Sequence, residues 1–478
     1  MTFLAPEMTY AIPELYLLGV ACVLLLVDLF LREDQRHLTY HLALATLAGL
    51  AGLNWISEPE VRTLAFAGTF VADPLATMLK QVCTAAVAVS FVYSRDYLAE
   101  RGLMRGEYFV LGLTALLGMM VIISAHSLLT IYLGLELLSL SLYAMVALDR
   151  DSPVASEAAM KYFVLGAIAS GVLLYGMSLL YGITGTLDVS GMAAALADGR
   201  GESIGATLAL ACVVIGLAFK LGAVPMHMWV PDVYHGAPTA VTLFIGSAPK
   251  VAAFALFMRL LVDGLGGMVD DWRPMLVLLA LLSLALGSVV AIAQANLKRM
   301  LAYSTISHVG FILIGFLAGS VEGYRAALFY TVTYVVMATA AFGTILLLAR
   351  RGYESDALDD LKGLGQRSPW FALVMLFVMF GMAGVPPFLG FYAKFAVLWA
   401  AVDAGLTWLA IAAVVFTIIS AYYYLRVVKL MYFDAPREGP PVEGRFELRM
   451  VLTLNGLALL VLGIVPDRLL ALCARVIG

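Results

Sequence analysis

The chain contains 478 residues, of which 62% are hydrophobic and only 13% are charged, and its mean hydropathy is +0.95. Soluble globular domains carry about 25% charged residues, so the composition excludes a soluble protein and predicts an integral membrane protein. The net charge of −4 is near neutral. Without a basic block or a nucleic-acid-binding motif, we expect no nucleic-acid partner.

Cysteine usage argues against a redox or metal centre on this chain. The four cysteines, Cys22, Cys83, Cys212 and Cys473, are far apart and form no CxxC pair, whereas iron–sulfur and structural zinc sites need clustered ligands. The sequence also lacks the GxGxxG, Walker and haem-attachment motifs. We therefore expect inert thiols, no metal and no bound cofactor, with any redox chemistry on another chain.

Apolar runs broken by short polar or Gly/Pro loops predict about fourteen membrane spans, since a span needs about 20 mostly apolar residues. The first run lacks the basic flank and cleavage site of a signal peptide, so we expect it to be the first span. No loop is long enough for a soluble domain, and residues 1–478 should form one all-α membrane domain. The predicted spans are 10–31, 39–56, 70–93, 106–123, 127–148, 155–184, 203–229, 237–261, 274–294, 298–318, 324–349, 369–402, 405–431 and 447–472.

Lysine and arginine positions predict the orientation in the membrane. With the N-terminus outside, seventeen of the 29 basic residues fall inside and seven outside, as the positive-inside rule requires. Both termini should therefore face the periplasm. The inside set is Arg32, Arg36, Arg95, Arg101, Arg105, Arg150, Lys298, Arg299, Arg350, Arg351, Lys362, Arg367, Arg426, Lys429, Arg437, Arg445 and Arg449, the outside set is Arg62, Arg200, Arg259, Arg273, Arg325, Arg468 and Arg475, and the embedded set is Lys80, Lys161, Lys220, Lys250 and Lys394.

One carboxylate, Glu136, is embedded as well. A charge near the bilayer centre costs at least about 2.5 kcal/mol. Glu136 lies in the middle of the span 127–148, roughly 14 Å from either surface, too deep to reach the interface. We expect it to act in a proton relay or an ion pair, and the alternative is a buried carboxyl hydrogen-bonded to Ser139.

Lys220 precedes a proline in the stretch FKLGAVP. Because Pro225 has no N–H, the Leu221 carbonyl loses its helical partner, and we predict a broken helix at this point. Charged residues beside broken helices are typical of transporter sites. Burial favours neutral lysine and a nearby carboxylate favours the charged form, so Lys220 is a candidate proton carrier. The alternative is a static ion pair.

Two further lysines follow the same logic, because Lys250 directly follows Pro249 and Lys394 comes shortly after the predicted break at Pro386-Pro387. Lys161 is a weaker candidate. It follows Glu157 by four residues, a favourable helical ion-pair spacing, and it could instead reach the interface.

The remaining embedded groups are Lys80, which we interpret as structural, and two histidines. His308 lies among Ser and Thr in LAYSTISHVG and His227 follows the predicted break. His308 could pass protons between two lysines through water near neutral pH, and the alternative is a satisfied core residue.

The chain also shows signs of an internal duplication. Lys220 stands before GAVP at 222–225, and AGVP at 383–386 stands before Lys394. An inverted repeat would place both sites near the membrane midplane. We predict two inverted five-helix halves, 106–261 and 274–431, each with a broken helix, and flanking helices within 1–93 and 447–478.

Two stretches carry a family resemblance, FKLGAVPMHMWVPDVYHGAPTAVT at 219–242 and NLKRMLAYSTISHVGF at 296–311. They closely resemble signatures of the antiporter-like membrane subunits of bacterial respiratory complex I, the proton-pumping NADH:quinone oxidoreductase. The PDVYHGAP segment and Lys394, where subunit M usually has glutamate, resemble subunit N. The length leaves no room for the lateral helix of subunit L. The resemblance covers essentially the whole chain.

The resemblance implies a role for each candidate residue. Glu136 matches the fifth-helix carboxylate paired with Lys220 on the broken seventh helix, Lys250 matches the connector on the eighth helix, and Lys394 matches the lysine of the second half. Other positions match members of the same proton chain, namely Lys161, His227 and His308.

The resemblance further implies that NADH, FMN, iron–sulfur clusters and quinone act on other subunits. It implies subunit M and small K/J-type subunits as neighbours, and a place in the bacterial inner membrane. Three alternatives stay open. The chain could be an Mrp-type cation/proton antiporter subunit, a membrane subunit of an energy-converting hydrogenase, or a structural subunit whose charges only hold helices together.

Overall fold

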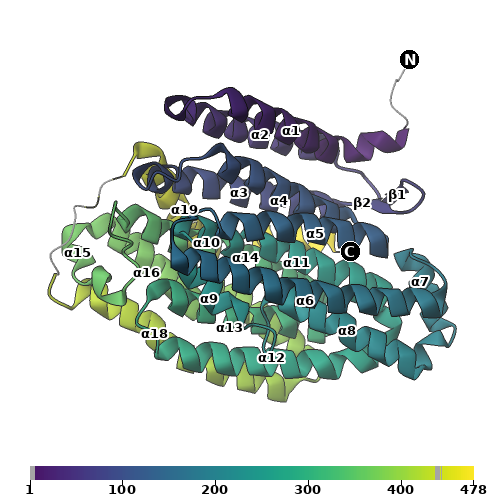
Figure 1. Cartoon of the computed structure of the whole chain (residues 1–478). Coiled ribbons are helices and arrows are strands. Elements are labelled where there is room, and N and C mark those ends of the chain that lie inside the picture. Colours follow the sequence, from purple (N-terminus) through teal and green to yellow (C-terminus); the bar gives the residue numbers. More distant parts are fainter. Residues whose placement is uncertain (1–5, 437–441, 443, 478) are drawn as a thin grey trace. The chain divides into compact units, whose positions relative to one another are not determined.

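The computed structural model describes residues 6–436, 442 and 444–477, and most of this described chain is helical (Figure 1). Arg437, which we assign to the inside set, lies outside the described residues. Within the described part, the strands form one antiparallel hairpin, β1 (Thr63–Ala65) with β2 (Phe70–Ala72). The predicted span 70–93 is therefore wrong at its start, since the helix begins only at Pro74.

The chain forms two compact units. Unit 1 comprises Met1–Phe91, Met104–Lys220 and Ala248–Met275, and unit 2 comprises Val92–Leu103, Leu221–Ser247 and Leu276–Gly478. Three helices contribute residues to both units, namely α3 (Pro74–Glu100), α8 (Ile204–Leu221), whose last residue belongs to unit 2, and α12 (Val269–Ile292).

Unit 1 contains the first helices of the chain. These are η1 (Pro6–Ala11), α1 (Ile12–Phe30), η2 (Glu33–Gln35), α2 (His37–Ile56), α4 (Gly106–Ser124), α5 (Leu128–Val146), α6 (Pro153–Thr184), α7 (Val189–Ala197), η3 (Arg200–Glu202), α8 (Ile204–Leu221), α11 (Ala248–Phe257), the π-helix η4 (Met258–Gly264) and η5 (Gly266–Met268). In unit 1, α1 packs on α2 and α4, and α5 packs between α4 and α6.

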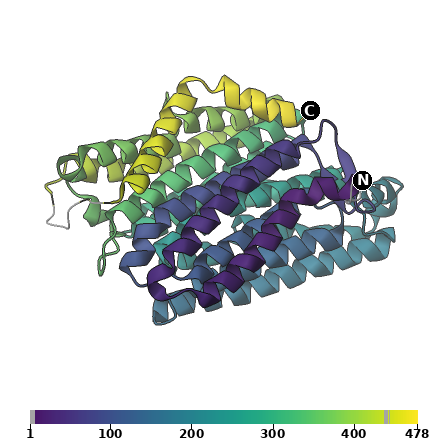
Figure 2. The same cartoon turned by 90° about the horizontal axis from the view of Figure 1, so that it is seen from above.

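Unit 2 is built around α14, which contacts α10, α13, α16, α17 and α19 and is almost entirely buried. Its helices are α9 (Trp229–Gly236), α10 (Thr239–Gly246), α13 (Leu297–Leu317), α14 (Val321–Leu348), η6 (Leu358–Leu361), α15 (Leu364–Arg367), α16 (Pro369–Ala383), α17 (Leu389–Asp403), α18 (Thr407–Tyr432), α19 (Phe446–Ile464) and α20 (Asp467–Val476). The last helix, α20, follows a bend after α19 (Figure 2).

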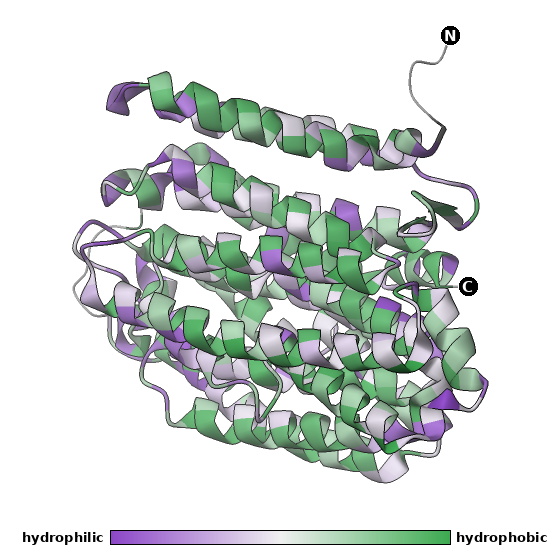
Figure 3. Cartoon of the chain, turned by 45° about the vertical axis from the view of Figure 1, so that its right-hand side comes forward, coloured by the Kyte–Doolittle hydropathy of each residue, from purple (hydrophilic) through white to green (hydrophobic). Residues whose placement is uncertain are grey.

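Twelve helices of the described chain are long and apolar enough to cross a membrane, and hydrophilic residues concentrate at helix ends and in loops (Figure 3). The remaining two predicted spans correspond to α2, which carries His37, His41 and Asn54, and to the broken pair α16 and α17. The prediction of an all-α, multi-pass membrane fold is therefore confirmed.

Both predicted helix breaks are present. Helix α8 ends at Leu221, before Gly222 with φ of +80°, and α16 ends at Ala383, before Gly384 with φ of +84°. A left-handed residue just after a helix is a common C-terminal cap. The spans predicted as 203–229 and 369–402 are thus each interrupted. The span predicted as continuous over 237–261 is wrong in detail, because α10 ends at Gly246 and a second helix, α11, starts at Ala248.

Glycines allow a close contact between α4 and α5 in unit 1. A Cβ on Gly118 would lie 2.5 Å from the Leu138 nitrogen, and one on Gly134 would lie 2.9 Å from the Ile122 nitrogen. Small residues at such positions let membrane helices approach closely. In unit 2, a Cβ on Gly287 of α12 would lie 2.5 Å from the Ser307 nitrogen of α13.

We expect Gly118→Ala to destabilise the protein by about 1–3 kcal/mol, because the added methyl group meets backbone atoms that cannot rotate away. Thermal unfolding of the purified complex measures the effect. Gly171→Ala on α6, where nothing lies within 4 Å of the added atom, is the matched control. Equal midpoints for the two variants would contradict the contact.

Candidate functional site

Lys220 lies in the last turn of α8, directly before the break. Its Nζ donates hydrogen bonds to Ser139 Oγ at 2.8 Å and to Ser170 Oγ at 3.3 Å. A cation at a helix C-terminus is favoured by the helix dipole and by the free carbonyl groups there. The break, the dipole and two buried hydroxyls therefore hold this half-buried ammonium in unit 1.

Glu136 lies on α5, one turn before Ser139, and interacts electrostatically with Lys220. Its Oε1 is buried and has no hydrogen-bond partner among the described residues. Ser139 donates its own hydrogen to the Leu135 carbonyl at 2.7 Å, so the hydroxyl serves Lys220 as an acceptor. The structure thus brings the predicted pair Glu136 and Lys220 together around Ser139.

The other two lysine candidates of unit 1 differ in burial. Lys250, in the first turn of α11, is 1% exposed and packs inside unit 1. Lys161 lies on an exposed part of α6 and forms the predicted ion pair with Glu157 at 2.8 Å. The structure therefore supplies a buried environment for Lys250 and a surface ion pair for Lys161.

Unit 1 also holds two buried ion pairs with tighter geometry. Lys80 Nζ lies 2.6 Å from Glu14 Oε1, and the side chains are 7% and 9% exposed. Arg259 binds Asp73 with both contacts at 2.8 Å. Burial would raise the pKa of Asp73, but the Arg259 guanidinium outweighs it and leaves the pKa below the ordinary value. Removing one partner of such a pair would leave a buried charge without compensation.

The second lysine site lies at the other break, in unit 2. Lys394, on the second turn of α17, is buried, and its Nζ donates to the Ala383 carbonyl at 3.0 Å, the last residue of α16. A Cβ on Gly384 would lie 2.8 Å from Lys394 Cδ. Gly384 therefore provides both the left-handed turn and the space through which the lysine reaches the helix end.

His308 lies on α13 in the same unit and is 2% exposed. One ring nitrogen, Nδ1, lies 2.7 Å from the Tyr330 hydroxyl, and Nε2 lies 3.1 Å from the Tyr424 hydroxyl. Lys394 Nζ lies 5.2 Å from the Phe311 ring centre, one turn further along α13, and interacts electrostatically with His308. Unit 2 thus brings His308 and Lys394 together, with tyrosine hydroxyls on both sides of the histidine.

His227 lies in the segment between α8 and α9, where it is half-buried. Its Nδ1 has no hydrogen-bond partner among the described residues. Among the described residues of the chain, no group of three or more His, Cys, Asp or Glu side chains could hold a metal ion.

Several polar groups at these sites could not be recognised from the sequence. Ser170 and the two tyrosines that bind His308 come from distant segments, and hydroxyl groups are common in all spans. Lys298, the second residue of α13, is buried and does not face solvent. Because Lys298 stands next to Arg299 at the start of a predicted span, the sequence indicates a positive charge at the membrane interface.

Comparisons with known proteins agree with this architecture. Residues 125–420 match the family model described as NADH:quinone oxidoreductase/Mrp antiporter, TM. The chain is 59% identical to the NADH-quinone oxidoreductase subunit N of Thioalkalivibrio sulfidiphilus over 100% of both chains. It is 58% identical to that of Thiobacillus denitrificans, over 98% of this chain and 97% of the relative.

Solved structures give the same picture. A chain of respiratory complex I from Thermus thermophilus has a TM-score of 0.84 at 31% identity and covers 97% of this chain and 100% of that chain. A chain of the Mrp complex from a Dietzia species has a TM-score of 0.85 at 22% identity, covering 100% of this chain and 97% of that chain. The second likeness concerns the fold alone.

These matches define the class as the antiporter-like membrane subunits of respiratory and Mrp complexes. Within this class, the chain belongs to the subunit N family of NADH-quinone oxidoreductases. It is accordingly a multi-pass membrane subunit of a proton-pumping enzyme complex in the bacterial inner membrane. This confirms the expectation drawn from the sequence and favours it over the antiporter and hydrogenase alternatives.

Proposed function

We propose that protons cross this subunit through two lysine sites on broken helices, with Glu136, Lys220 and Lys250 in unit 1 and His308 and Lys394 in unit 2. The observation that carries the proposal is the position of Lys220. Its ammonium is held by two hydroxyl groups at a helix break, and the nearby Glu136 carboxylate interacts with it electrostatically. A lysine held in this way can change its protonation without losing its place in the fold.

In the proposed cycle, Glu136 favours the protonated form of Lys220. Two unit charges about 4 Å apart interact by roughly 4 kcal/mol at an effective dielectric constant near 20. A change in a neighbouring subunit that weakens this interaction would release the proton to Lys250 and onward through His308 to Lys394. Lys161 and His227 are secondary members of the proposed chain.

We also propose the inverted halves 106–261 and 274–431 and periplasmic termini. Each half contains a break with a lysine beside it, and each contains a glycine-mediated contact between its first two helices, α4 with α5 and α12 with α13. These shared features support a duplication. The distribution of basic residues supports the orientation.

The redox reaction belongs, in this proposal, to other subunits, which bind NADH, FMN, iron–sulfur clusters and quinone. The scattered positions of the four cysteines support the absence of a redox centre on this chain. Subunit M and small K/J-type subunits are the proposed neighbours.

Glu136→Gln tests the proposal. We expect proton pumping driven by NADH oxidation to fall, because the uncharged amide no longer favours protonated Lys220. Acidification by membrane vesicles, normalised to assembled complex, measures it. Glu322→Gln, which removes an exposed carboxylate paired with Arg325 on α14, is the control. Unchanged pumping in the Glu136 variant would remove Glu136 from the path.

A further inference from the structure

A buried lysine of unit 2 is not used by the path proposed above. Lys298 lies in the first turn of α13 and is 3% exposed. Its Nζ donates to the Ala237 carbonyl at 3.3 Å, at the end of α9. The helix dipole disfavours a cation in the first turn of α13, so the stability of that helix does not account for a lysine at this position.

The contacts of Lys298 are looser than those of the structural ion pairs. Its Nζ lies 3.7 Å from Glu354 and 3.8 Å from Asp356, whereas the pair of Lys80 with Glu14 measures 2.6 Å. Its hydrogen bond to a carbonyl at the end of a short helix repeats the arrangement of Lys394 at Ala383. Lys298 therefore resembles Lys394, the lysine of the proposed site in unit 2, more than it resembles a lysine in a static ion pair.

Glu354 lies in the loop after α14, close to Lys298, and accepts several hydrogen bonds. Its carboxylate accepts from Tyr97 at 2.7 Å, from Thr239 at 2.5 Å and from Arg101 at 2.8 Å. Burial would raise the pKa of Glu354, but Lys298 and Arg101 outweigh it and leave the pKa below its ordinary value. A carboxylate that stays ionised at neutral pH thus faces Lys298, and His235 and Asp356 are the other titratable groups whose charges act there.

Polar side chains continue along α13 from Lys298 towards His308. Ser304 Oγ lies 2.5 Å from the Tyr424 hydroxyl, which in turn lies 3.1 Å from His308 Nε2. Lys298, Thr305 and His308 share one face of the helix, because residues three, four and seven positions apart lie on the same side. His308 then leads to Lys394, as described above.

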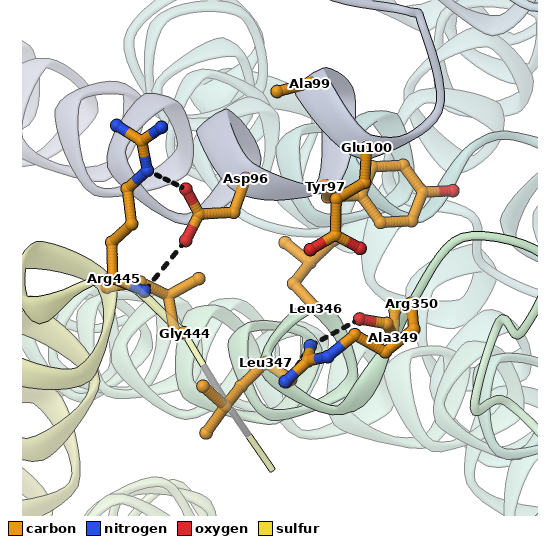
Figure 4. A pocket seen from close by; sticks show the side chains of 11 residues that line it. Asp96, Tyr97, Ala99, Glu100, Leu346, Leu347, Ala349, Arg350, Gly444 and Arg445 are labelled. Atoms are coloured by element: carbon orange, nitrogen blue, oxygen red, sulfur yellow. Dashed lines mark hydrogen bonds and ion pairs between the residues drawn. The ribbon is translucent and has the colours of Figure 1, made fainter. Parts of the chain in front are cut away.

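A pocket of about 420 Å³ adjoins the other side of this cluster. It is lined by the ends of α3 and α14 and the start of α19, and the Glu100 carboxylate points into it, with Tyr97 and Arg350 at one side and the pair of Asp96 with Arg445 at the other (Figure 4). The pocket has room for several water molecules, each of about 30 Å³. Tyr97 lines this polar pocket, and its hydroxyl donates to Glu354 and accepts from the Thr239 N–H, so Tyr97 joins the pocket to the cluster around Lys298.

We propose that Lys298 is a proton carrier that supplies the Lys394 site from the pocket lined by Tyr97. This inference rests on the proposed function and adds a second entry for protons. The distribution of basic residues assigns this end of unit 2 to the inside of the membrane, so protons would enter from that side. In each step the Lys298 ammonium passes one proton, by way of water along α13, to the hydrogen-bonded group of Ser304, Tyr424 and His308. The neutral amine then takes one proton back from water in the pocket, by way of Tyr97 and Glu354.

Three variants in the intact complex test the inference, with the rate of proton pumping per assembled complex as the readout and a native gel as the check on assembly. We expect Lys298→Met and Lys298→Arg both to lower proton pumping by about tenfold or more, since neither side chain can release a proton at neutral pH. Arg299→Gln, which removes a partly exposed ion pair with Asp232 at 2.9 Å on the same helix turn, should leave the pumping rate at the wild-type value.

Wild-type pumping in Lys298→Arg would overturn the inference, because a structural ion pair needs only the charge. If Lys298→Met does not assemble, Tyr97→Phe decides, since it removes only a hydroxyl group. A lowered pumping rate in Tyr97→Phe supports the entry, and a wild-type rate contradicts it. Lys220→Ala in the same preparation separates the two proposals. Normal pumping in Lys220→Ala would contradict the proposed function. Lost pumping in Lys220→Ala together with normal pumping in the Lys298 variants would contradict only this inference.

Discussion

Lys220→Ala should abolish both proton pumping and NADH:quinone turnover in complexes that still assemble. The ammonium is held by Ser139 and Ser170 at the end of α8, and alanine leaves these hydroxyls without a titratable partner. A positioned proton donor or acceptor contributes about 100-fold or more to a proton-transfer step, and pumping and turnover should fall together if they are coupled through this residue.

The measurement combines quinone reduction with acidification in membrane vesicles, after the assembly has been checked on a native gel. Lys429→Ala is the matched control, because Lys429 is an exposed lysine paired with Asp434 near the end of α18. Wild-type turnover and pumping in assembled Lys220→Ala complexes would show that the buried charges serve only structure.

Lys80→Ala should have the largest effect on assembly. Lys80 and Glu14 form a 2.6 Å ion pair between α3 and α1 that is almost fully buried. Removing one partner of a buried pair costs about 3–5 kcal/mol, because the other charge remains buried without compensation. We expect little assembled complex in this variant, measured on native gels and by thermal unfolding.

The double variant Glu14→Gln with Lys80→Met distinguishes charge from packing. It keeps the approximate volumes and leaves no buried charge, and uncharged replacements of buried pairs are often neutral. We expect it to restore assembly and pumping, in line with our interpretation of Lys80 as structural. Full assembly of Lys80→Ala itself would contradict the importance of the pair.

Much of the fold follows from the sequence, because the hydrocarbon layer imposes a simple length rule on apolar runs. All fourteen predicted spans correspond to helices, and both predicted breaks are present, since Pro225 and Pro386-Pro387 interrupt helical hydrogen bonding. The break at Ser247 escaped prediction because it lies two residues before Pro249, a position that a helix start tolerates equally well. The hairpin of β1 and β2 is too short to give a pattern.

The site was predictable only in part. Glu136 and Lys394 stand out because a charge inside an apolar run is costly and rare, and the roles assigned to them remain predictions. The hydroxyl groups of Ser170, Tyr330 and Tyr424 come from distant segments, so no local spacing indicates their contacts. Lys298 escaped notice because a basic residue at the end of a span normally faces water.

The most direct test of the central claim is proton pumping by the assembled complex with Lys220→Arg. Arginine keeps the positive charge at the end of α8 but does not release its proton. The proposed mechanism predicts that the complex assembles and that proton pumping and NADH:quinone turnover are both lost. Pumping at the wild-type rate would contradict it and would mean that a fixed charge is sufficient at this position.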